Sequence, residues 1–185
     1  MKIYLSTEEV KQLQAFVSKD KSRFILQGIC ITPMGGHVEF AATNGNSLLI
    51  IRRKVDQSET LPEKQIVLKM PKLKYKGIVL LEDIPGNEGC CYVWTNGAES
   101  KGLADVLTGA TYPNYNLVAP LNYRSMPKAA EYVGFSAESL ERLEKVIPQP
   151  FKQKPWAQNA KSPHIWDTEI DGRTKVVVIM PFPAR

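Results

Sequence analysis

The feature that most constrains the fold is an order of elements that the chain repeats. Residues 1–59 show the pattern of a strand, a helix and three further strands, which is a β-α-β-β-β unit. The same order begins again after the polar segment DQSETLPEK, and part of it returns near residue 127. We therefore expect a complete domain over 1–126, built from half-units 1–59 and 60–126, and a half domain over 127–185.

The first half-unit carries the clearest local signals. Ser6 and Glu9 form a capping box, which predicts a helix with apolar residues at helical spacing: Val10, Leu13, Phe16 and Val17. Strands are expected over 24–32, 37–43 and 47–55. The Gly35-Gly36 and Asn44-Gly45 pairs mark the two turns between them.

The other two half-units repeat this order less regularly. In the second, strands are expected over 65–70, 77–83, 90–95 and 100–107, with a short basic helix or turn over 71–76. An extended connection is expected over 111–122, because Pro113 and Pro120 oppose a helix. In the third, we expect a short strand over 132–135, a helix capped by Ser136, an irregular segment over 148–163 and a hairpin over 165–180.

Composition narrows the class of protein. A chain of 185 residues with 43% hydrophobic residues can bury a sizeable core. No run reaches the roughly 18 apolar residues of a membrane span, and no signal peptide is recognisable, so a cytoplasmic protein is expected. The three cysteines show no metal or disulfide spacing.

Charge is distributed unevenly along the chain. Lys and Arg number 24 against 19 Asp and Glu, which is compatible with binding to nucleic acid. Residues 64–76 carry five lysines and no acid. This segment is either a basic patch that contacts phosphates or an ordinary solvated face.

Enzyme motifs are missing from the sequence. The two histidines, His37 and His164, have no neighbouring nucleophile motif, and no phosphate-binding loop or HExxH motif occurs. Asp167, Glu169 and Asp171 alternate along one expected strand, where a solvent-facing hairpin edge is favoured over a metal site. We therefore expect a protein that is not an enzyme and that needs no cofactor or metal.

Four stretches of the sequence carry a resemblance to a known family. FILQGICI, VEFAATNGNSLLI and LTGATYPNYNLVAP resemble, in order and spacing, stretches of the middle domain of the bacterial DNA polymerase III β subunit, the sliding clamp. The end of the chain, VVVIMPFPAR, is similar to the end of that family's last domain. The resemblance implies an α+β clamp fold of paired half-units, with antiparallel sheets outside and helices on the inner face.

The resemblance also implies a function. Sliding clamps are processivity factors of DNA replication that encircle duplex DNA without sequence specificity and dock short peptides of polymerases and other replication proteins. Because family members form rings of twelve half-units, a homo-oligomer is expected, either a dimer or a tetramer. The alternative is a reduced clamp-like binding module, a decoy or regulator, that captures peptides without encircling DNA.

Two sets of site residues follow from the resemblance. Peptide docking would involve Leu26, Thr43, Gly45, Asn46, Ser47, Leu48, Pro113, Leu117, Val118, Val178 and Met180. Contact with DNA phosphates would involve Lys11, Lys19, Lys21 and Arg23 from the first helix, Lys69, Lys72, Lys74 and Lys76 from the second, and Arg142 and Lys145 from the third.

The sequence departs from the family at the expected cleft. Asn46, Ser47 and Leu117 stand where the family has His, Arg and Arg, which predicts a less polar pocket. The irregular segment 148–163 replaces regular strands. We expect it to cover the cleft or to act as a lid.

Overall fold

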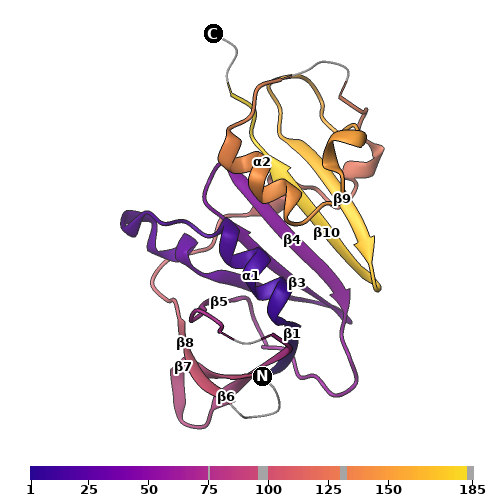
Figure 1. Ribbon diagram of the computed structural model, residues 1–185. Coiled ribbons are helices and arrows are strands. Elements are labelled where there is room, and N and C mark those ends of the chain that lie inside the picture. Colours follow the sequence, from indigo (N-terminus) through magenta and orange to yellow (C-terminus); the bar gives the residue numbers. More distant parts are fainter. Residues whose placement is uncertain (75, 96–99, 130–132, 183–185) are drawn as a thin grey trace.

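A single antiparallel sheet organises the molecule (Figure 1). The computed structural model describes residues 1–74, 76–95, 100–129 and 133–182. Ten strands of this part of the chain pair in the order β1 (Lys2–Ser6), β6 (Ile78–Ile84), β7 (Asn87–Thr95), β8 (Ser100–Val106), β5 (Ile66–Lys69), β2 (Ile29–Met34), β3 (His37–Thr43), β4 (Ser47–Lys54), β10 (Arg173–Ile179) and β9 (His164–Ile170).

The strand order links residues 1–59 with residues 60–126 in both directions. β1, from the first of these segments, pairs with β6 from the second, with Ile3 opposite Leu81. In return, β5 from the second segment pairs with β2 from the first, with Cys30 opposite Val67. Residues 127–185 extend the same sheet, because the whole of β10 pairs with β4.

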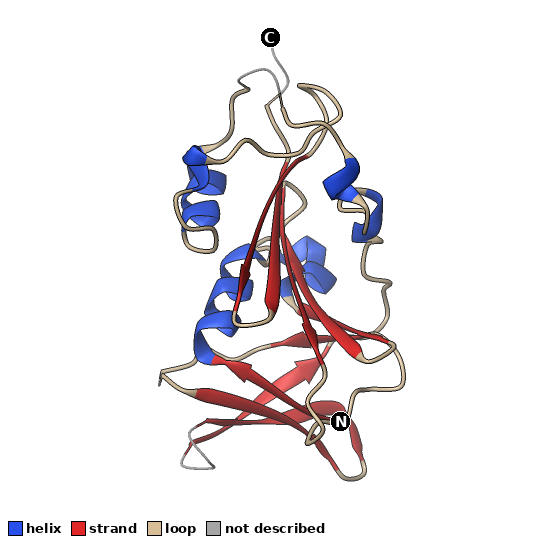
Figure 2. Cartoon of the chain, turned by 90° about the vertical axis from the view of Figure 1, so that its right-hand side faces the viewer, coloured by secondary structure: helices blue, strands red, loops and turns tan. Residues whose placement is uncertain are grey.

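Two α-helices in the described residues lie on the same side of the sheet (Figure 2). Helix α1 (Thr7–Phe16) begins at Ser6, which forms the expected capping box with Glu9. Helix α2 (Ala137–Glu144) begins at Ser136, whose hydroxyl accepts a hydrogen bond from the backbone N–H of Ser139. Both predicted helix starts are therefore confirmed.

The sheet buries apolar side chains on both faces, because successive side chains of its central strands point to opposite faces and both sets are apolar. Along β4, Leu49 and Ile51 face the two helices and join a core with Phe16, Phe40 and Leu143. The neighbouring side chains in the sequence, Leu48 and Ile50, face the other side and join a second core with Val176, Val178, Tyr112, Tyr115 and Tyr123. We call residues 107–126 the strap, because this segment covers the second face.

Several predicted elements differ from the observed ones. Residues 24–27 are not strand but the end of a 3-10 helix, η1 (Lys21–Gln27). Residues 71–74 and 76 form no helix, and Tyr75 lies outside the described residues. A six-residue segment that starts with proline and alternates with lysine offers too short an apolar face to nucleate a helix.

The remaining expectations have mixed outcomes. No strand forms over 133–135, and Tyr132 lies outside the described residues. The short 3-10 turn η2 (Tyr115–Leu117) interrupts the expected extended connection, and η3 (Tyr123–Ser125) follows directly after it. The turn η4 (Pro150–Lys152) lies in the irregular segment. The last hairpin is confirmed, because Asp171 and Gly172 form its turn with φ of 52° and 70°. Among the described residues, no helix is long and apolar enough to span a membrane.

Candidate functional site

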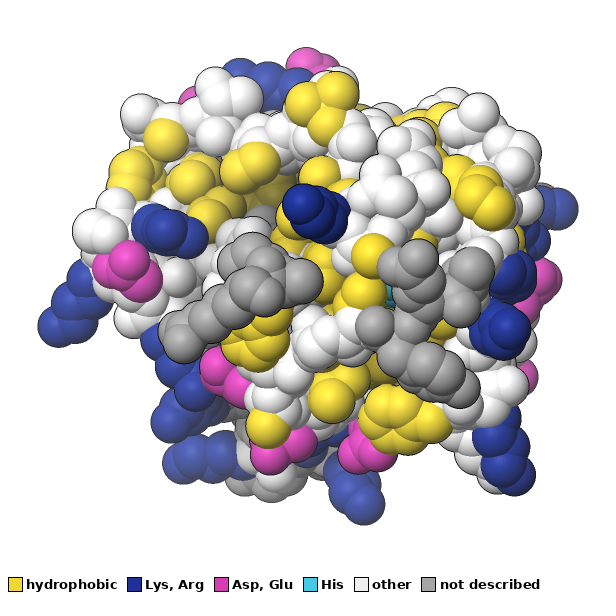
Figure 3. Space-filling view, turned by 90° about the horizontal axis from the view of Figure 1, so that it is seen from above, with side chains coloured by type: hydrophobic (Ala, Val, Ile, Leu, Met, Phe, Trp, Pro, Cys, Tyr) yellow, Lys and Arg dark blue, Asp and Glu magenta, His cyan; other side chains and the backbone are white. Residues whose placement is uncertain are grey.

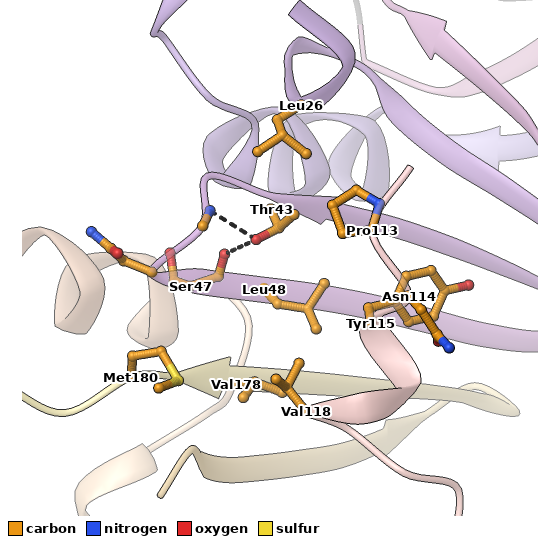
Figure 4. Close-up of a pocket in the computed structure, with 12 residues that line it drawn as sticks. Leu26, Thr43, Ser47, Leu48, Pro113, Asn114, Tyr115, Val118, Val178 and Met180 are labelled. Atoms are coloured by element: carbon orange, nitrogen blue, oxygen red, sulfur yellow. Dashed lines mark hydrogen bonds between the residues drawn. The ribbon is translucent and has the colours of Figure 1, made fainter. Parts of the chain in front are cut away.

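A pocket of about 180 Å³ lies where the first half-unit, the strap and the third half-unit meet (Figure 4). Leu26 and Thr43 lie across the pocket from Val118 and Val178. The described residues that line it are Leu26, Thr43, Gly45, Asn46, Ser47, Leu48, Pro113, Asn114, Tyr115, Val118, Val178 and Met180. Ten of the eleven residues expected to dock peptides are in this set.

One side chain organises the turn that forms the first wall. Asn44 Oδ1 accepts hydrogen bonds from the backbone N–H of Asn46 at 3.0 Å and from the backbone N–H of Ser47 at 2.9 Å. Thr43 Oγ1 accepts from the N–H of Gly45 at 3.0 Å and donates to the carbonyl of Ser47 at 2.8 Å. Gly45 has φ of 97°, a conformation that favours glycine. Most hydrogen bonds of the turn therefore involve the side chains of Thr43 and Asn44, beside one backbone bond from the N–H of Asn44 to the carbonyl of Ser47 at 3.3 Å.

The strap forms the second wall and is fixed to the sheet by tyrosines. The Tyr112 hydroxyl donates to the carbonyl of Ala41 at 3.4 Å, and the Tyr123 hydroxyl donates to Asp167 at 2.7 Å. Burial and the adjacent Asp167 carboxylate raise the pKa of Tyr123 to about 12, so its hydroxyl stays a donor at neutral pH. Val118 and Pro113 reach the pocket because these anchors hold the strap in place.

Two lining residues were missed by the sequence reasoning, and one prediction failed. Asn114 and Tyr115 line the pocket between the predicted Pro113 and Val118. Leu117 is not among the described lining residues, and 81% of its surface is exposed. It lies in the short η2 turn, where Tyr115 points inward and Leu117 outward. The spacing of the two buried tyrosines, Tyr112 and Tyr115, was the available signal.

The chemistry of the pocket is mainly apolar. None of the described lining residues carries a charge at neutral pH, and the polar groups lie in the 43–47 turn and at Asn114. Arg23 lies just beyond the lining, with its Nη1 3.4 Å from the carbonyl oxygen of Asn44. Such a surface suits hydrophobic anchors of a ligand whose backbone also needs hydrogen-bond partners.

The residues expected to contact DNA are more scattered than predicted. Lys11 is exposed on α1, but Lys19, Lys21 and Arg23 lie beyond the end of that helix, in a loop and in η1. Lys69, at the end of β5, and Lys72, Lys74 and Lys76 in the segment that follows it are exposed, although no second helix presents them. Lys145 is exposed at the end of α2.

Arg142 is the clear correction in this set. It is only 6% exposed and donates hydrogen bonds to Glu138 and Ser47, so it does not face solvent as a phosphate contact would. The side chains that α2 does expose include Glu138, Glu141 and Glu144, and α1 exposes Glu8 beside Lys11. The helical side of the sheet is therefore mixed in charge and acidic along α2.

Other candidate features have structural roles or no role at the pocket. No described residue of 148–163 lines it, so this segment is not its cover. Asp167 is buried beside Tyr123 and Arg124 instead of standing on a solvent-facing edge, and no cluster of three metal-ligating side chains occurs among the described residues. Burial raises the pKa of the Cys30 thiol to about 12, which keeps it protonated and unreactive.

The surface beyond the pocket also carries exposed hydrophobic side chains. They include Leu117, Leu121, Phe151 and Phe182, each at least 60% exposed. Seen from above relative to Figure 1, the surface shows several separate hydrophobic patches, with most lysines and arginines towards the margin (Figure 3).

Comparison with known proteins places the fold. No protein-family model and no curated protein matches the chain. A putative DNA polymerase III β subunit from Eubacterium rectale is similar over 98% of this chain and 65% of its own length, with a TM-score of 0.65 and 10% identity. A sliding clamp from Pseudomonas aeruginosa bound to griselimycin is similar over 100% of this chain and 66% of its own length, with a TM-score of 0.64 and 12% identity.

A third solved structure agrees with these two. A sliding clamp from Bartonella birtlesii, also bound to griselimycin, covers 99% of this chain and 66% of its own, with a TM-score of 0.66 and 14% identity. The chain therefore has the α+β sliding-clamp fold, and it spans about two thirds of the length of these clamps.

Proposed function

We propose that the chain is a clamp-like accessory protein of DNA replication, without catalytic activity, that docks short extended peptides of a DNA polymerase or another replication protein. The observation that carries the proposal is the apolar pocket at the joint of three segments of the chain. Its location, in a chain with the sliding-clamp fold, agrees with the docking site that the sequence resemblance implies. A cytoplasmic location stays part of this proposal.

The lining supports a peptide as the ligand. Leu26, Leu48 and Val178 offer an apolar floor for a hydrophobic anchor, while the 43–47 turn presents polar groups at one side. Peptides that combine hydrophobic anchors with backbone hydrogen bonds bind such surfaces in extended form. Since Asn46 and Ser47 replace the charged or aromatic residues of the family, anchors without a charged neighbour should bind best.

Binding of griselimycin tests the proposal, because clamps from P. aeruginosa and B. birtlesii have been solved with this compound bound. Titration calorimetry with griselimycin, and with a labelled peptide that carries two leucine or phenylalanine anchors, would measure both affinities. Met180→Asp changes a half-exposed lining residue and should weaken binding at least tenfold. Leu103→Asp changes a similarly exposed residue on β8 and should leave binding unchanged. If neither probe binds the wild-type protein, the docking function is wrong.

Contact with duplex DNA is the second part of the proposal. The exposed lysines of 69–76 and of 19–21 would bind phosphates without reading the sequence. Encirclement would require a homo-oligomer, either a dimer or a tetramer, and retention on closed circular DNA that disappears after the circle is cut. Light scattering with and without DNA measures the mass of the assembly.

A second candidate function follows from the charges of the helices. The exposed acids of α2 and the burial of Arg142 favour a binding module that captures peptides without encircling DNA. This module would bind the peptide probe as a monomer and would pass freely off circular and linear DNA alike. A concentration-independent monomer mass together with peptide binding would select this candidate over the ring.

A further inference from the structure

A buried arginine from the third half-unit reaches the turn that shapes the pocket. The side chain of Arg142, on α2, is 7% exposed. Its Nη1 donates a hydrogen bond to Ser47 Oγ at 3.2 Å, and its Nη2 donates to Glu138 Oε1 at 2.7 Å. Among the described residues, the bond from Arg142 to Ser47 is the hydrogen bond that joins a side chain of α2 to the 44–47 turn.

Ser47 passes this contact on to the rest of the turn. Its hydroxyl donates to Asn44 Oδ1 at 3.2 Å, and the same oxygen accepts the backbone N–H groups of Asn46 and Ser47. One amide oxygen therefore gathers three donors, and the Ser47 hydroxyl connects it to the guanidinium. The hydroxyl hydrogen points away from Arg142 towards Asn44 because the guanidinium has no acceptor.

The third half-unit holds the turn from a second direction as well. The backbone N–H of Met180 donates to the carbonyl of Asn46 at 3.0 Å, just beyond the end of β10. Asn46, Ser47 and Met180 all line the pocket. Arg142 and Met180 thus contact the same four-residue turn, one through a side chain and the other through its backbone.

We propose that Arg142 is a positioning residue for the pocket, holding Ser47 and the 44–47 turn in the shape that receives a ligand. This inference rests on the proposed docking function. A buried guanidinium suits the role because it remains charged, and its hydrogen bonds to neutral acceptors are stronger than those between neutral groups. Glu138 balances its charge at the margin of the helix, where 60% of the Glu138 side chain is exposed.

The test compares Arg142→Met and Ser47→Ala, which remove the same hydrogen bond from its two ends. Glu144→Gln, on the exposed side of α2, is the matched control. Hydrogen exchange at the amides of Asn46 and Ser47 should become at least fivefold faster in both variants and stay unchanged in the control. The affinity for griselimycin should fall about tenfold, as expected for the removal of a hydrogen bond to a charged group.

Two further comparisons separate positioning from a general loss of stability. If Arg142 acts through Ser47, the double variant should bind no more weakly than the weaker-binding single variant. Exchange of amides in β6 and β7, far from the turn in the sheet order, should stay at its wild-type rate. If Arg142→Met does not fold, Ser47→Ala still removes the hydrogen bond and tests the proposal by itself.

Each outcome decides one of the two proposals. The role of Arg142 would be overturned if both variants bound griselimycin as tightly as the wild type and if the amides of Asn46 and Ser47 exchanged at the wild-type rate. The docking function would then remain intact. Loss of affinity that only follows the unfolded fraction would also overturn the role of Arg142. Failure of wild-type binding would reject the docking function, while the exchange rates would still decide whether Arg142 holds the turn.

Discussion

The Tyr115 hydroxyl donates a hydrogen bond to the buried carboxylate of Glu39 at 2.9 Å, and this contact fastens the strap to β3. Thr32 Oγ1 lies 3.1 Å from the same hydroxyl, and Arg52 pairs with Glu39. Burial raises the pKa of Tyr115, so the hydroxyl keeps its hydrogen at any pH the protein encounters in a cell. The wall of the pocket thus depends on a polar group that lies beneath it.

Removal of this hydroxyl should weaken the fold and the pocket together. Tyr115→Phe leaves an acceptor of Glu39 unpaired, and the free energy of unfolding should fall by about 1–3 kcal/mol. Urea denaturation followed by circular dichroism measures this change. Leu117→Ala, two residues away and exposed, should change it by less than about 0.5 kcal/mol. Equal stability of the Tyr115 variant and the wild type would refute the anchoring role.

Gly28 should not tolerate a side chain, although its backbone conformation is ordinary. A Cβ at this position would lie 2.6 Å from Val67 Cγ1 and 3.1 Å from the carbonyl oxygen of Leu68. Gly28→Ala should therefore push β5 away from β2 and lower the thermal midpoint, at a cost of about 1–3 kcal/mol. Gly89→Ala meets no atom closer than 3.4 Å and serves as the control in the same melting experiment. A wild-type midpoint in Gly28→Ala would contradict the close packing.

Glu59 should make stability depend on pH in the acid range. Burial acts to raise the pKa of its carboxyl group, but hydrogen bonds from Arg53 and from the backbone N–H groups of Tyr4 and Asp56 outweigh it, and the pKa lies below its ordinary value. A carboxylate of this kind stabilises the fold fully above its unfolded pKa of about 4.3, and the contribution disappears as the pH falls through the folded pKa.

The corresponding variant is Glu59→Gln. It should unfold more easily at pH 7, by about 3 kcal/mol, because the buried Arg53 loses its ionic partner. Below about pH 4.5 its stability should fall less steeply than that of the wild type. Glu63→Gln removes an exposed carboxylate nearby and should reproduce the wild-type curve in denaturation at about pH 3 to 7. Parallel curves for Glu59→Gln and the wild type would exclude this carboxylate as the source of the slope.

Salt dependence should reveal which lysines bind DNA. If Lys72, Lys74 and Lys76 neutralise phosphates, their combined replacement by alanine should reduce the slope of log affinity against log salt by about 0.9 for each phosphate that is no longer neutralised. Fluorescence anisotropy with a labelled duplex at several salt concentrations measures the slope. Alanine at the exposed lysines Lys152, Lys154 and Lys161 is a control of the same charge change. Equal slopes for the two triple variants would show that 72–76 is only a solvated segment.

The sequence was sufficient for elements that carry local signals. The capping box at Ser6 placed α1, the Asp171-Gly172 pair placed the last turn, and short apolar runs located most strands. Ten residues of the pocket were found through short motifs at family spacing, although their docking role stays a prediction.

The errors arise where distant packing decides the structure. The run at 24–27 reads as strand by composition, but the chain turns there into η1 and buries Leu26 at the pocket. The sequence suggests that Arg142 is a surface cation on an otherwise acidic helix. In the fold, Ser47 at the start of β4 lies next to it and accepts its hydrogen bond. Leu117 points outward because Tyr115, two residues earlier, takes the inward position. The positions of Leu26 and Arg142 thus depend on segments that are distant in the sequence.

The exchange of first strands between the two half-units has a consequence for synthesis. β1 is synthesised before its partner β6, which follows only after the rest of residues 1–59 and β5. β4 must likewise wait for β10. Because contacts between distant segments close slowly, the nascent chain should carry open strand edges for much of its translation. Protection by a chaperone during that interval is therefore expected to govern the yield of folded protein.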